Sequence, residues 1–362
     1  MCKKKICIVM PEIGSGGVEA VLLNFFSHID CTKYDLDIIT YKISNDYRKK
    51  FFEELGFRII LIPPKKEGMG KSIYAMDCVF KENRYDVVHA HMTMWNCIPM
   101  FLAWKRKVPI RISHSHLAVK PNGLVNKGVL LLQRVIIKLF ANRLCACGED
   151  AAISLYGRKT YEKKQVTVIN NAIDVKKFKK NVAVRKDVRR KLGISENTFC
   201  VGHIGRFHEH KNHTFLIKIF KELHKQIPNS KLLLVGDGDL KERIIAETKE
   251  NGIFTDVLFA GVRNDPERIY QAMDVFCMPS LYEGLPVVGI EAQAVGLPCV
   301  FSDGISPKVC ITRLATVIPL SANAEEWAEA IVKLRGYNIN EIFPRCYDIK
   351  HETQKWEKLY DK

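Results

Sequence analysis

Short apolar runs alternate with amphipathic segments along the first half of the chain. Segments 18–27 and 46–55 place apolar residues at helical spacing, and each lies between two runs of the kind that forms buried strands. The strand-like runs are residues 6–10, 36–40, 58–62, 87–90, 110–113, 144–147 and 166–169. Strands that alternate with helices predict parallel sheets joined by crossover helices.

The alternation of strand-like and helical segments resumes after a charged stretch. Residues 175–193 are rich in lysine and arginine and poor in strand formers, which favours a linker and a charged helix. The later strand-like runs are 199–204, 231–235, 257–260, 275–278 and 299–302. A chain of 362 residues is also too long for one ordinary core. The sequence therefore predicts an α/β protein with domains 1–174 and 198–342, a connection over 175–197 and a final segment, 343–362.

Composition favours a soluble enzyme of a reducing compartment. Charged residues make up 27% of the chain and the apolar set 47%. The basic residues 3–5 precede an apolar run that is too short for the core of a signal peptide. The 12 cysteines include no Cys-x-x-Cys pair, so neither a disulfide framework nor a zinc site is indicated. We expect a cytoplasmic protein.

The net charge of +16 creates a field that attracts polyanions. Diphosphates, an anionic membrane surface and nucleic acid all qualify as partners. The chain has no zinc-finger spacing and no aromatic RNA-binding motif, so nucleic acid is not an expected partner.

Residues 125–140 form an unusually apolar helical segment, broken only by Lys127, Gln133, Arg134 and Lys138. One interpretation is a buried domain helix whose cations reach solvent. The other is an interfacial helix through which residues 125–143 contact anionic lipid on the inner face of the cell membrane. The interrupting charges exclude a transmembrane span.

The most informative motif is the stretch PSLYEGLP at 279–286. It follows the apolar run 275–278, and Pro286 lies where a first helical position is expected, so Glu283 falls in a strand-to-helix turn. Free backbone N–H groups around Gly284 and Leu285 favour a phosphate there, while a carboxylate accepts hydrogen bonds from hydroxyls. Glu291 adds a second carboxylate on an otherwise apolar helix. These features predict a site for a sugar nucleotide.

Cations and glycines follow other strands of the second domain. Arg206 and Lys211 flank the turn that begins at Gly205, between strand 199–204 and a helix that Asn212 is expected to cap. Fixed cations stabilise the charge that develops on a leaving diphosphate. Gly236, after strand 231–235, and Arg263, after strand 257–260, complete the expected donor-binding residues of this domain.

Five motifs in register resemble the retaining glycosyltransferases of family 4. They are Gly16-Gly17-Val18-Glu19, Gly205-Arg206-Phe207 with Lys211-Asn212, Val235-Gly236-Asp237-Gly238, Gly261 before Asp274, and Glu283-x₇-Glu291. The resemblance covers nearly the whole chain. It implies the GT-B fold, in which two Rossmann-like domains face each other across a cleft and the last helix returns to the first domain.

The resemblance also implies roles for individual residues. Arg206 and Lys211 would hold the diphosphate and act as the main catalytic groups, with the leaving phosphate as the base. Glu283 would bind the hydroxyls of the transferred sugar and Glu291 those of the ribose. The loop with Gly16 and Gly17 would lie near the diphosphate or the acceptor. A histidine after strand 110–113 would face the donor sugar, and either His114 or His116 fills that place.

The implied activity is that of a hexosyltransferase of the bacterial polysaccharide-biosynthesis type. It would move a sugar from a nucleotide sugar to a glycan or a lipid-linked sugar, without a cofactor. The pairs His89/His91 and His114/His116 could be imagined as a metal site, but no carboxylate or cysteine partner stands out in the sequence. We expect catalysis without metal.

Two other functions fit part of the sequence. A sugar-nucleotide epimerase of the same fold would use the histidines as acid and base and need no acceptor. A non-enzymatic basic module would bind membrane or nucleic acid in a manner that fades with salt. The Glu283-x₇-Glu291 spacing favours the transferase.

Overall fold

The computed structural model describes residues 3–14, 16–117, 123–336 and 343–361. The chain divides into two compact units. The first consists of Met1–Ala172 together with Asp348–Lys362, and the second of Ile173–Tyr347.

The first unit is built on a parallel sheet that has seven strands among the described residues, in the order β3-β2-β1-β4-β5-β6-β7. The strands are β1 Lys4–Val9, β2 Tyr34–Thr40, β3 Phe57–Leu61, β4 Val87–Ala90, β5 Ile110–Ser115, β6 Arg143–Ala146 and β7 Val166–Val168. The helices are α1 Gly17–Phe26, α2 Asp46–Glu54, α3 Met69–Asn83, α4 Cys97–Lys105, α5 Gly123–Phe140, α6 Glu149–Tyr156, α7 Arg158–Glu162 and α14 Ile349–Lys358. Every strand predicted in this half is present, as the apolar runs require.

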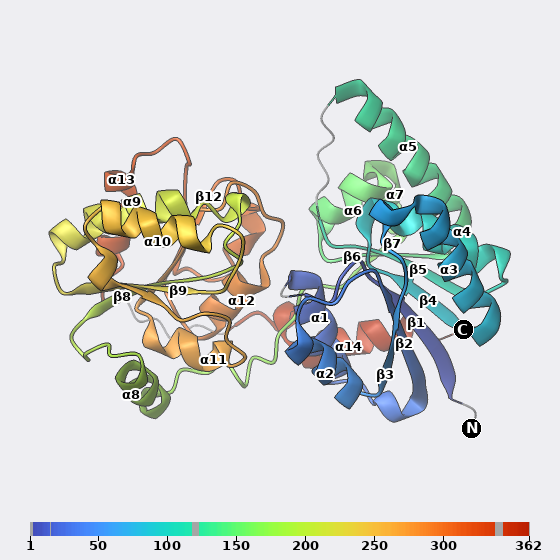
Figure 1. Ribbon diagram of the computed structural model, residues 1–362, viewed down its shortest axis with the longest axis horizontal. Coiled ribbons are helices and arrows are strands. Elements are labelled where there is room, and N and C mark those ends of the chain that lie inside the picture. Colours follow the sequence, from blue (N-terminus) through green and yellow to red (C-terminus); the bar gives the residue numbers. More distant parts are fainter. Residues whose placement is uncertain (1–2, 15, 118–122, 337–342, 362) are drawn as a thin grey trace. The chain divides into compact units, whose positions relative to one another are not determined.

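Helix α14, near the end of the chain, belongs to the first unit (Figure 1). Its Trp356 ring stacks on Phe25 of α1, with centroids 4.3 Å apart. The buried carboxylate of Glu352 accepts a hydrogen bond from the backbone N–H of Asn170 at 2.9 Å and pairs with Lys355 at 2.6 Å. An unpaired buried carboxylate would be costly, so the hydrogen bond from Asn170 helps to hold the helix in place.

The second unit is also a parallel α/β sheet, with six strands in its described part, in the order β10-β9-β8-β11-β12-β13. The strands are β8 Phe199–Ile204, β9 Ser230–Val235, β10 Val257–Phe259, β11 Val275–Met278, β12 Cys299–Ser302 and β13 Ala315–Ile318. The helices are α8 Val182–Lys191, α9 His213–Gln226, α10 Lys241–Glu250, α11 Pro266–Ile269, α12 Val287–Ala294 and α13 Ala324–Lys333. The sequence pattern missed β13, a short edge strand in which only Ile318 is fully buried.

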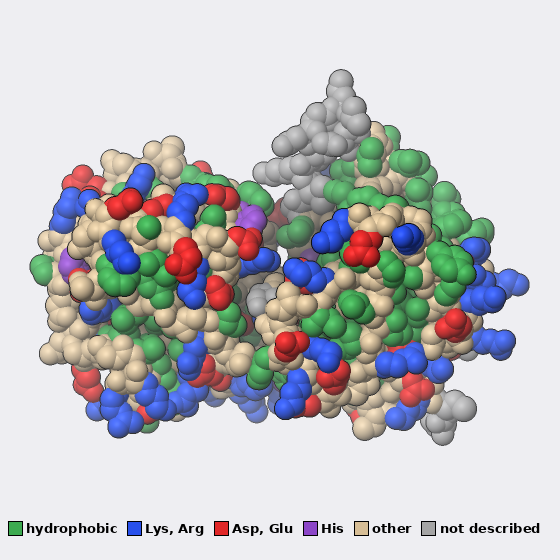
Figure 2. Space-filling model, viewed as in Figure 1, with side chains coloured by type: hydrophobic (Ala, Val, Ile, Leu, Met, Phe, Trp, Pro, Cys, Tyr) green, Lys and Arg blue, Asp and Glu red, His purple; other side chains and the backbone are tan. Residues whose placement is uncertain are grey.

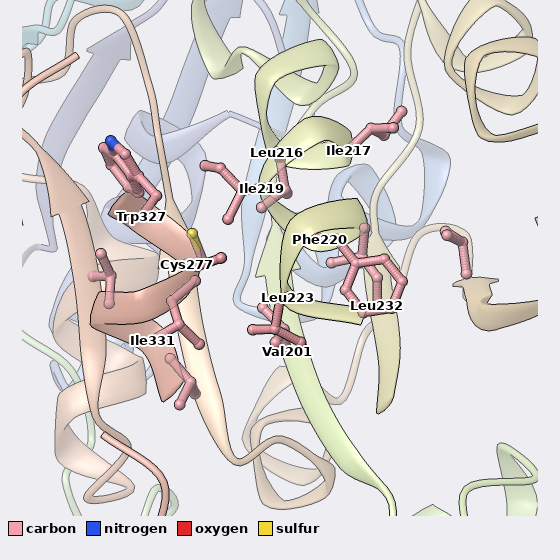
Figure 3. Packing of buried hydrophobic residues seen from close by; sticks show 14 of the residues in the cluster. Val201, Leu216, Ile217, Ile219, Phe220, Leu223, Leu232, Cys277, Trp327 and Ile331 are labelled. Atoms are coloured by element: carbon pink, nitrogen blue, oxygen red, sulfur yellow. The ribbon is translucent and has the colours of Figure 1, made fainter. Parts of the chain in front are cut away.

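The core of the second unit lies between the sheet and helices α9 and α13. Leu216, Phe220 and Leu223 of α9 are fully buried against Val201 of the sheet, and Trp327 of α13 closes the cluster (Figure 3). Burial of side chains this large supplies much of the driving force for folding. The core fixes α9, and with it the loop from β8 that precedes α9.

Two local predictions need correction. Pro286 is the N-cap of α12 and not its first helical residue, because its backbone is still extended, with ψ of 124°. Asn212 does not cap α9 through its side chain; its backbone is left-handed, with φ of 58°. Its side-chain Nδ2 instead donates to the carbonyl oxygen of Pro279 at 3.1 Å. This hydrogen bond ties the loop after β8 to the loop after β11.

Parallel pairing places the carboxyl ends of neighbouring strands at one edge of each sheet. The glycine loop after β1 and the histidines at the ends of β4 and β5 therefore share an edge in the first unit, although His89 and His114 lie within these strands and only His91 and His116 follow them. The loops after β8, β9 and β11 share an edge in the second unit. Ligands of open α/β sheets bind at such edges.

Candidate active site

Glycines let the loops after β8 and β9 meet backbone to backbone. Gly205 donates its N–H to the Val235 carbonyl at 2.9 Å, and Gly236 donates to the Gly261 carbonyl at 2.8 Å. Gly236 has φ of +140°, and a Cβ at this position would overlap the Gly205 carbonyl oxygen. Only glycine fits such a close approach. The turn leaves the strand ends free of side-chain bulk, as a bound diphosphate requires.

A buried ion pair lies beside this turn. Lys211 Nζ is 2.6 Å from Glu283 Oε1, and the two side chains are only 12% and 16% exposed. Nε2 of His210 lies 3.3 Å from the same oxygen. The backbone N–H of Leu281 donates to the His210 carbonyl at 2.7 Å, so the loop that carries Lys211 and the loop that carries Glu283 are joined.

The electrostatics of the pair keep Glu283 ionised. Burial raises the pKa of its carboxyl group, but His210 and the Lys211 ammonium together outweigh that effect and hold the pKa below its ordinary value. The site thus offers a carboxylate that accepts hydrogen bonds from hydroxyls, next to an ammonium that attracts phosphate.

Glu283 is also held through its backbone. Its N–H donates to the Gly304 carbonyl at 3.1 Å, and it forms an isolated parallel bridge with Ile305. A Cβ on Gly304 would overlap the Leu281 carbonyl, so this position also needs glycine. The stretch after β12 therefore supports the loop that positions Glu283.

The other predicted donor-binding residues occupy distinct positions. Arg206 is 52% exposed and lies 3.8 Å from Asp239, a distance that leaves its guanidinium available to a ligand. Arg263 donates two hydrogen bonds of 2.8 Å to the carboxylate of Asp265. Gly284 and Leu285 form the partly buried turn between Glu283 and α12.

Glu291 lies on α12 and is only 8% exposed. The hydroxyl of Tyr270 donates to its Oε2 at 2.9 Å. Burial, with the neighbouring Glu291 carboxylate, raises the pKa of Tyr270 well above its usual value, so the tyrosine remains a donor. A buried carboxylate on an apolar helix needs a hydrogen-bond donor, and the Tyr270 hydroxyl is one such donor to Glu291.

Two residues of the second unit's site escaped the sequence analysis. His210 and Tyr270 contact Glu283 and Glu291 from other loops, and neither contact is encoded by spacing along the chain. The adjacency of His210 to Lys211 was the one available signal.

In the first unit, the loop with Gly16 and Gly17 is held by two charged side chains. Glu19 Oε1 accepts from the Gly14 N–H at 2.8 Å, and Arg48 Nη1 donates to the carbonyls of Gly14 and Gly16 at 3.1 and 2.7 Å. A Cβ on Gly16 would come within 2.7 Å of the Glu19 carboxylate, whereas Gly17 is open. These contacts hold Gly14 and Gly16 at the carboxyl edge of the sheet.

Four histidines form a buried network at the ends of β4 and β5. His89 Nε2 lies 3.2 Å from His114 Nδ1, and His91 Nδ1 lies 2.7 Å from His116 Nε2. His89 Nδ1 also contacts the Tyr360 hydroxyl at 3.1 Å. His114 and His116 are both buried, so which of them faces a donor sugar stays open.

The network also bears on metal binding. Ring nitrogens of His89, His91 and His114 lie within 4.8 Å of one another. Within the described residues, Nε2 of His91 and Nε2 of His114 are buried without a hydrogen-bond partner, whereas both ring nitrogens of His89 have one. A third imidazole ligand would have to give up its contact, so metal-free catalysis stays our prediction.

Comparison with known proteins identifies the family. Residues 15–177 match the family model described as Glycosyltransferase Family 4, and residues 184–335 match the one described as Glycosyl transferases group 1. EpsF of Bacillus subtilis, which is assigned as a glycosyltransferase, is 35% identical over 91% of this chain and 88% of its own length. The chain belongs to the family 4 glycosyltransferases. Its two parallel-sheet units are the Rossmann-like domains of the GT-B fold.

Two further relatives agree with this assignment. A UDP-galactose:GlcNAc-diphosphoundecaprenol α-1,3-galactosyltransferase of Escherichia coli is 28% identical over 84% of this chain and 80% of its own length. HepE of Anabaena, solved with UDP-glucose, superposes with a TM-score of 0.81 over 98% of both chains, at 18% identity. This chain is accordingly a glycosyltransferase with the GT-B fold.

The histidine network predicts acid lability. Burial, reinforced by the neighbouring histidines, lowers the pKa of His89, His91 and His114 well below the ordinary value of 6.5, and burial lowers that of His116 to about 4. These groups protonate more readily in the unfolded chain. Their full stability is therefore present above pH 6.5 and is lost below it, by about 1.4 kcal/mol per pH unit for each group. Thermal unfolding should show a clearly lower Tm at pH 5 than at pH 7.5.

The exposed His208 provides the control for this experiment. His208→Gln should keep the acid lability, whereas His116→Gln should reduce it. An equal Tm at the two pH values would contradict the buried network.

The glycine contact predicts a second stability effect. Gly236→Ala should destabilise the second unit by about 2 to 5 kcal/mol, because a Cβ overlaps the Gly205 carbonyl and the backbone is left-handed. Gly252→Ala is the matched control, since Gly252 has φ of +71° but no atom near its Cβ position. It should cost only about 1 to 2 kcal/mol in urea unfolding. Equal losses would show that the close approach is not restrictive.

Proposed function

We propose that the protein is a retaining glycosyltransferase that moves a sugar from a nucleotide-sugar donor to a glycan or lipid-linked acceptor in bacterial polysaccharide synthesis. The observation that carries the proposal is the Lys211–Glu283 pair beside the Gly205–Gly236 turn. An ammonium for phosphate and an ionised carboxylate for hydroxyls lie side by side there. UDP-glucose in the HepE structure and the UDP-galactose donor of the Escherichia coli relative support a nucleotide-sugar donor.

In this proposal the second unit binds the donor. Lys211 and the exposed guanidinium of Arg206 neutralise the diphosphate, whose charge grows as the glycosidic bond breaks. Glu283 accepts hydrogen bonds from the transferred sugar. Glu291, oriented by Tyr270, accepts them from the ribose. The leaving phosphate takes the acceptor's proton, so attack occurs on the face from which it departs and the configuration is retained.

Replacement of Lys211 tests the catalytic assignment. Lys211→Ala should lower turnover about a hundredfold or more, which corresponds to about 2.7 kcal/mol of transition-state stabilisation. Nucleotide release from UDP-, GDP- and ADP-sugars, measured with a chelator present, reports both the donor and the need for metal. Lys218→Ala, which removes an exposed lysine of α9, should leave turnover unchanged.

Two outcomes would refute this proposal. Near-normal turnover of Lys211→Ala would show that the lysine has no catalytic role. Loss of turnover in the presence of the chelator would show that the reaction needs a metal ion. Should no donor be turned over or bound, the basic binding module would become the better account.

We also propose that residues 125–143 contact the membrane surface. Leu130 and Ile137 of α5 are buried within the first unit. Its exposed residues include large apolar ones beside Lys127 and Lys138: Leu131, Leu132 and Leu139 are 60%, 61% and 67% exposed. Figure 2 shows hydrophobic side chains gathered over this side of the first unit, with lysines and arginines at its border. None of the helices in the described residues is long and apolar enough to cross a bilayer.

This surface fits peripheral docking on anionic lipid, in which apolar side chains enter the interface and lysines contact headgroups. Helix α5 has features of both a buried domain helix and an interfacial helix, since one face is buried and the other exposes apolar side chains. A lipid-linked acceptor would be presented at such a surface.

Vesicle sedimentation tests the docking. Leu132→Glu with Leu139→Glu should lower the fraction of protein bound to phosphatidylglycerol-rich vesicles at least tenfold, because two charges replace apolar side chains that would enter the membrane interface. Added salt should weaken binding of the unaltered protein. Val182→Glu, at an exposed apolar residue of α8 in the second unit, is the control and should bind normally. Undiminished binding of the double variant would exclude this face.

A further inference from the structure

Lys65 of the first unit is a half-buried cation without a carboxylate partner. In the described part of the chain, no carboxylate lies within ion-pair distance of its ammonium. Its Nζ is 3.7 Å from the ring centroid of Trp95 and 5.5 Å from that of Tyr41. Cation–π contacts compensate only part of the cost of removing an ammonium from water. The arrangement is that of a receptor for an anion.

The Trp95 ring is presented by a strained but firmly held turn. Thr93 has φ of 53°, a left-handed conformation that is rare for a β-branched residue. The fully buried Asn96 holds this turn. Its Oδ1 accepts from the Met92 N–H at 2.7 Å, and its Nδ2 donates to Ser113 Oγ at 2.9 Å. The indole nevertheless stays 38% exposed.

The segment that carries Lys65 is fixed as well. The hydroxyl of the buried Ser72 donates to the Pro63 carbonyl at 2.7 Å, and two prolines precede the lysine. The backbone that carries the Lys65 ammonium toward the indole is therefore stiff.

The three residues lie at the edge of the sheet where a ligand is expected. Tyr41, Lys65 and Trp95 follow the carboxyl ends of β2, β3 and β4. The glycine loop follows β1 at the same edge, between β2 and β4 in the sheet order. Ligands of open parallel sheets bind at this edge. The donor motifs lie in the second unit, so the edge in the first unit is left for the acceptor.

We propose that Lys65 and Trp95, with Tyr41 beside them, form an acceptor subsite that recognises a sugar joined to a diphosphate. The Lys65 ammonium binds the diphosphate, and the exposed indole of Trp95 packs against the sugar ring. This inference rests on the proposed function. The sugar-diphosphate acceptor named for the Escherichia coli relative has the same chemistry.

Direct binding separates this subsite from catalysis. The probes are a panel of hexosyl diphosphates carrying a short alkyl chain, and the matching alkyl glycosides that lack the diphosphate. Calorimetry on the full chain should show at least tenfold weaker binding of a diphosphate probe to Lys65→Gln, and near-normal binding to Lys65→Arg. Trp95→Ala should weaken binding of both kinds of probe, because the ring contacts the sugar.

A matched control and a pH series complete the test. Lys81→Gln removes an exposed lysine at the far end of α3 and should change nothing. Burial lowers the pKa of Lys65 to about 8, and the groups that face it stay neutral there: the pKa of Tyr41 is raised to about 12 and that of Cys97 is also raised. Affinity for the diphosphate probe should therefore be full below pH 8 and fall above it. Lys65→Arg should abolish this decline.

The proposal is overturned if no diphosphate probe binds the unaltered protein, or if Lys65→Gln and Trp95→Ala bind as it does. It is also overturned if Lys65→Gln weakens the glycoside and the diphosphate equally, which would indicate a structural defect. Probe binding without donor turnover would instead count against the proposed function and leave the subsite standing.

Discussion

The ion pair between Lys211 and Glu283 is the contact on which the proposed donor site depends. It joins a loop after β8 to a loop after β11, and the Lys211 side chain lies where a Cβ on Gly205 would come within 3.2 Å of it. A buried charge without its partner is costly, so each residue requires the other to keep its place. The pair is both a structural tie and the chemical centre of the site, which explains why the loops around it are braced by Asn212 and Gly304.

The same principle of sheet topology organises the first unit, with a different result. Its carboxyl edge collects neutral histidines, a braced glycine loop and the Lys65–Trp95 contact. Such an edge suits an anionic acceptor, as the donor edge suits a nucleotide sugar. A basic protein with an exposed apolar face on α5 is consistent with chemistry carried out beside an anionic membrane.

Much of this fold could be predicted from local pattern. Strands β4, β8, β11 and β12 have the bounds that their apolar runs indicated, because buried parallel strands are apolar on both faces. The turn that contains Glu283 could be predicted from the neighbouring Gly284 and Pro286. Edge strand β13 was missed because only one of its residues is fully buried. The contacts of His210, Tyr270 and Lys65 depend on which strands are neighbours, and no spacing along the chain contains that information.

We propose that Glu283 recognises the sugar while Lys211 recognises the phosphate. Titration of Glu283→Gln with the preferred donor and with its parent nucleoside diphosphate tests this division most directly. The variant should bind the nucleoside diphosphate within about threefold of the unaltered protein but lose the added affinity that the sugar provides. Equal losses for both ligands, or no loss for either, would contradict the assignment of the carboxylate to the sugar.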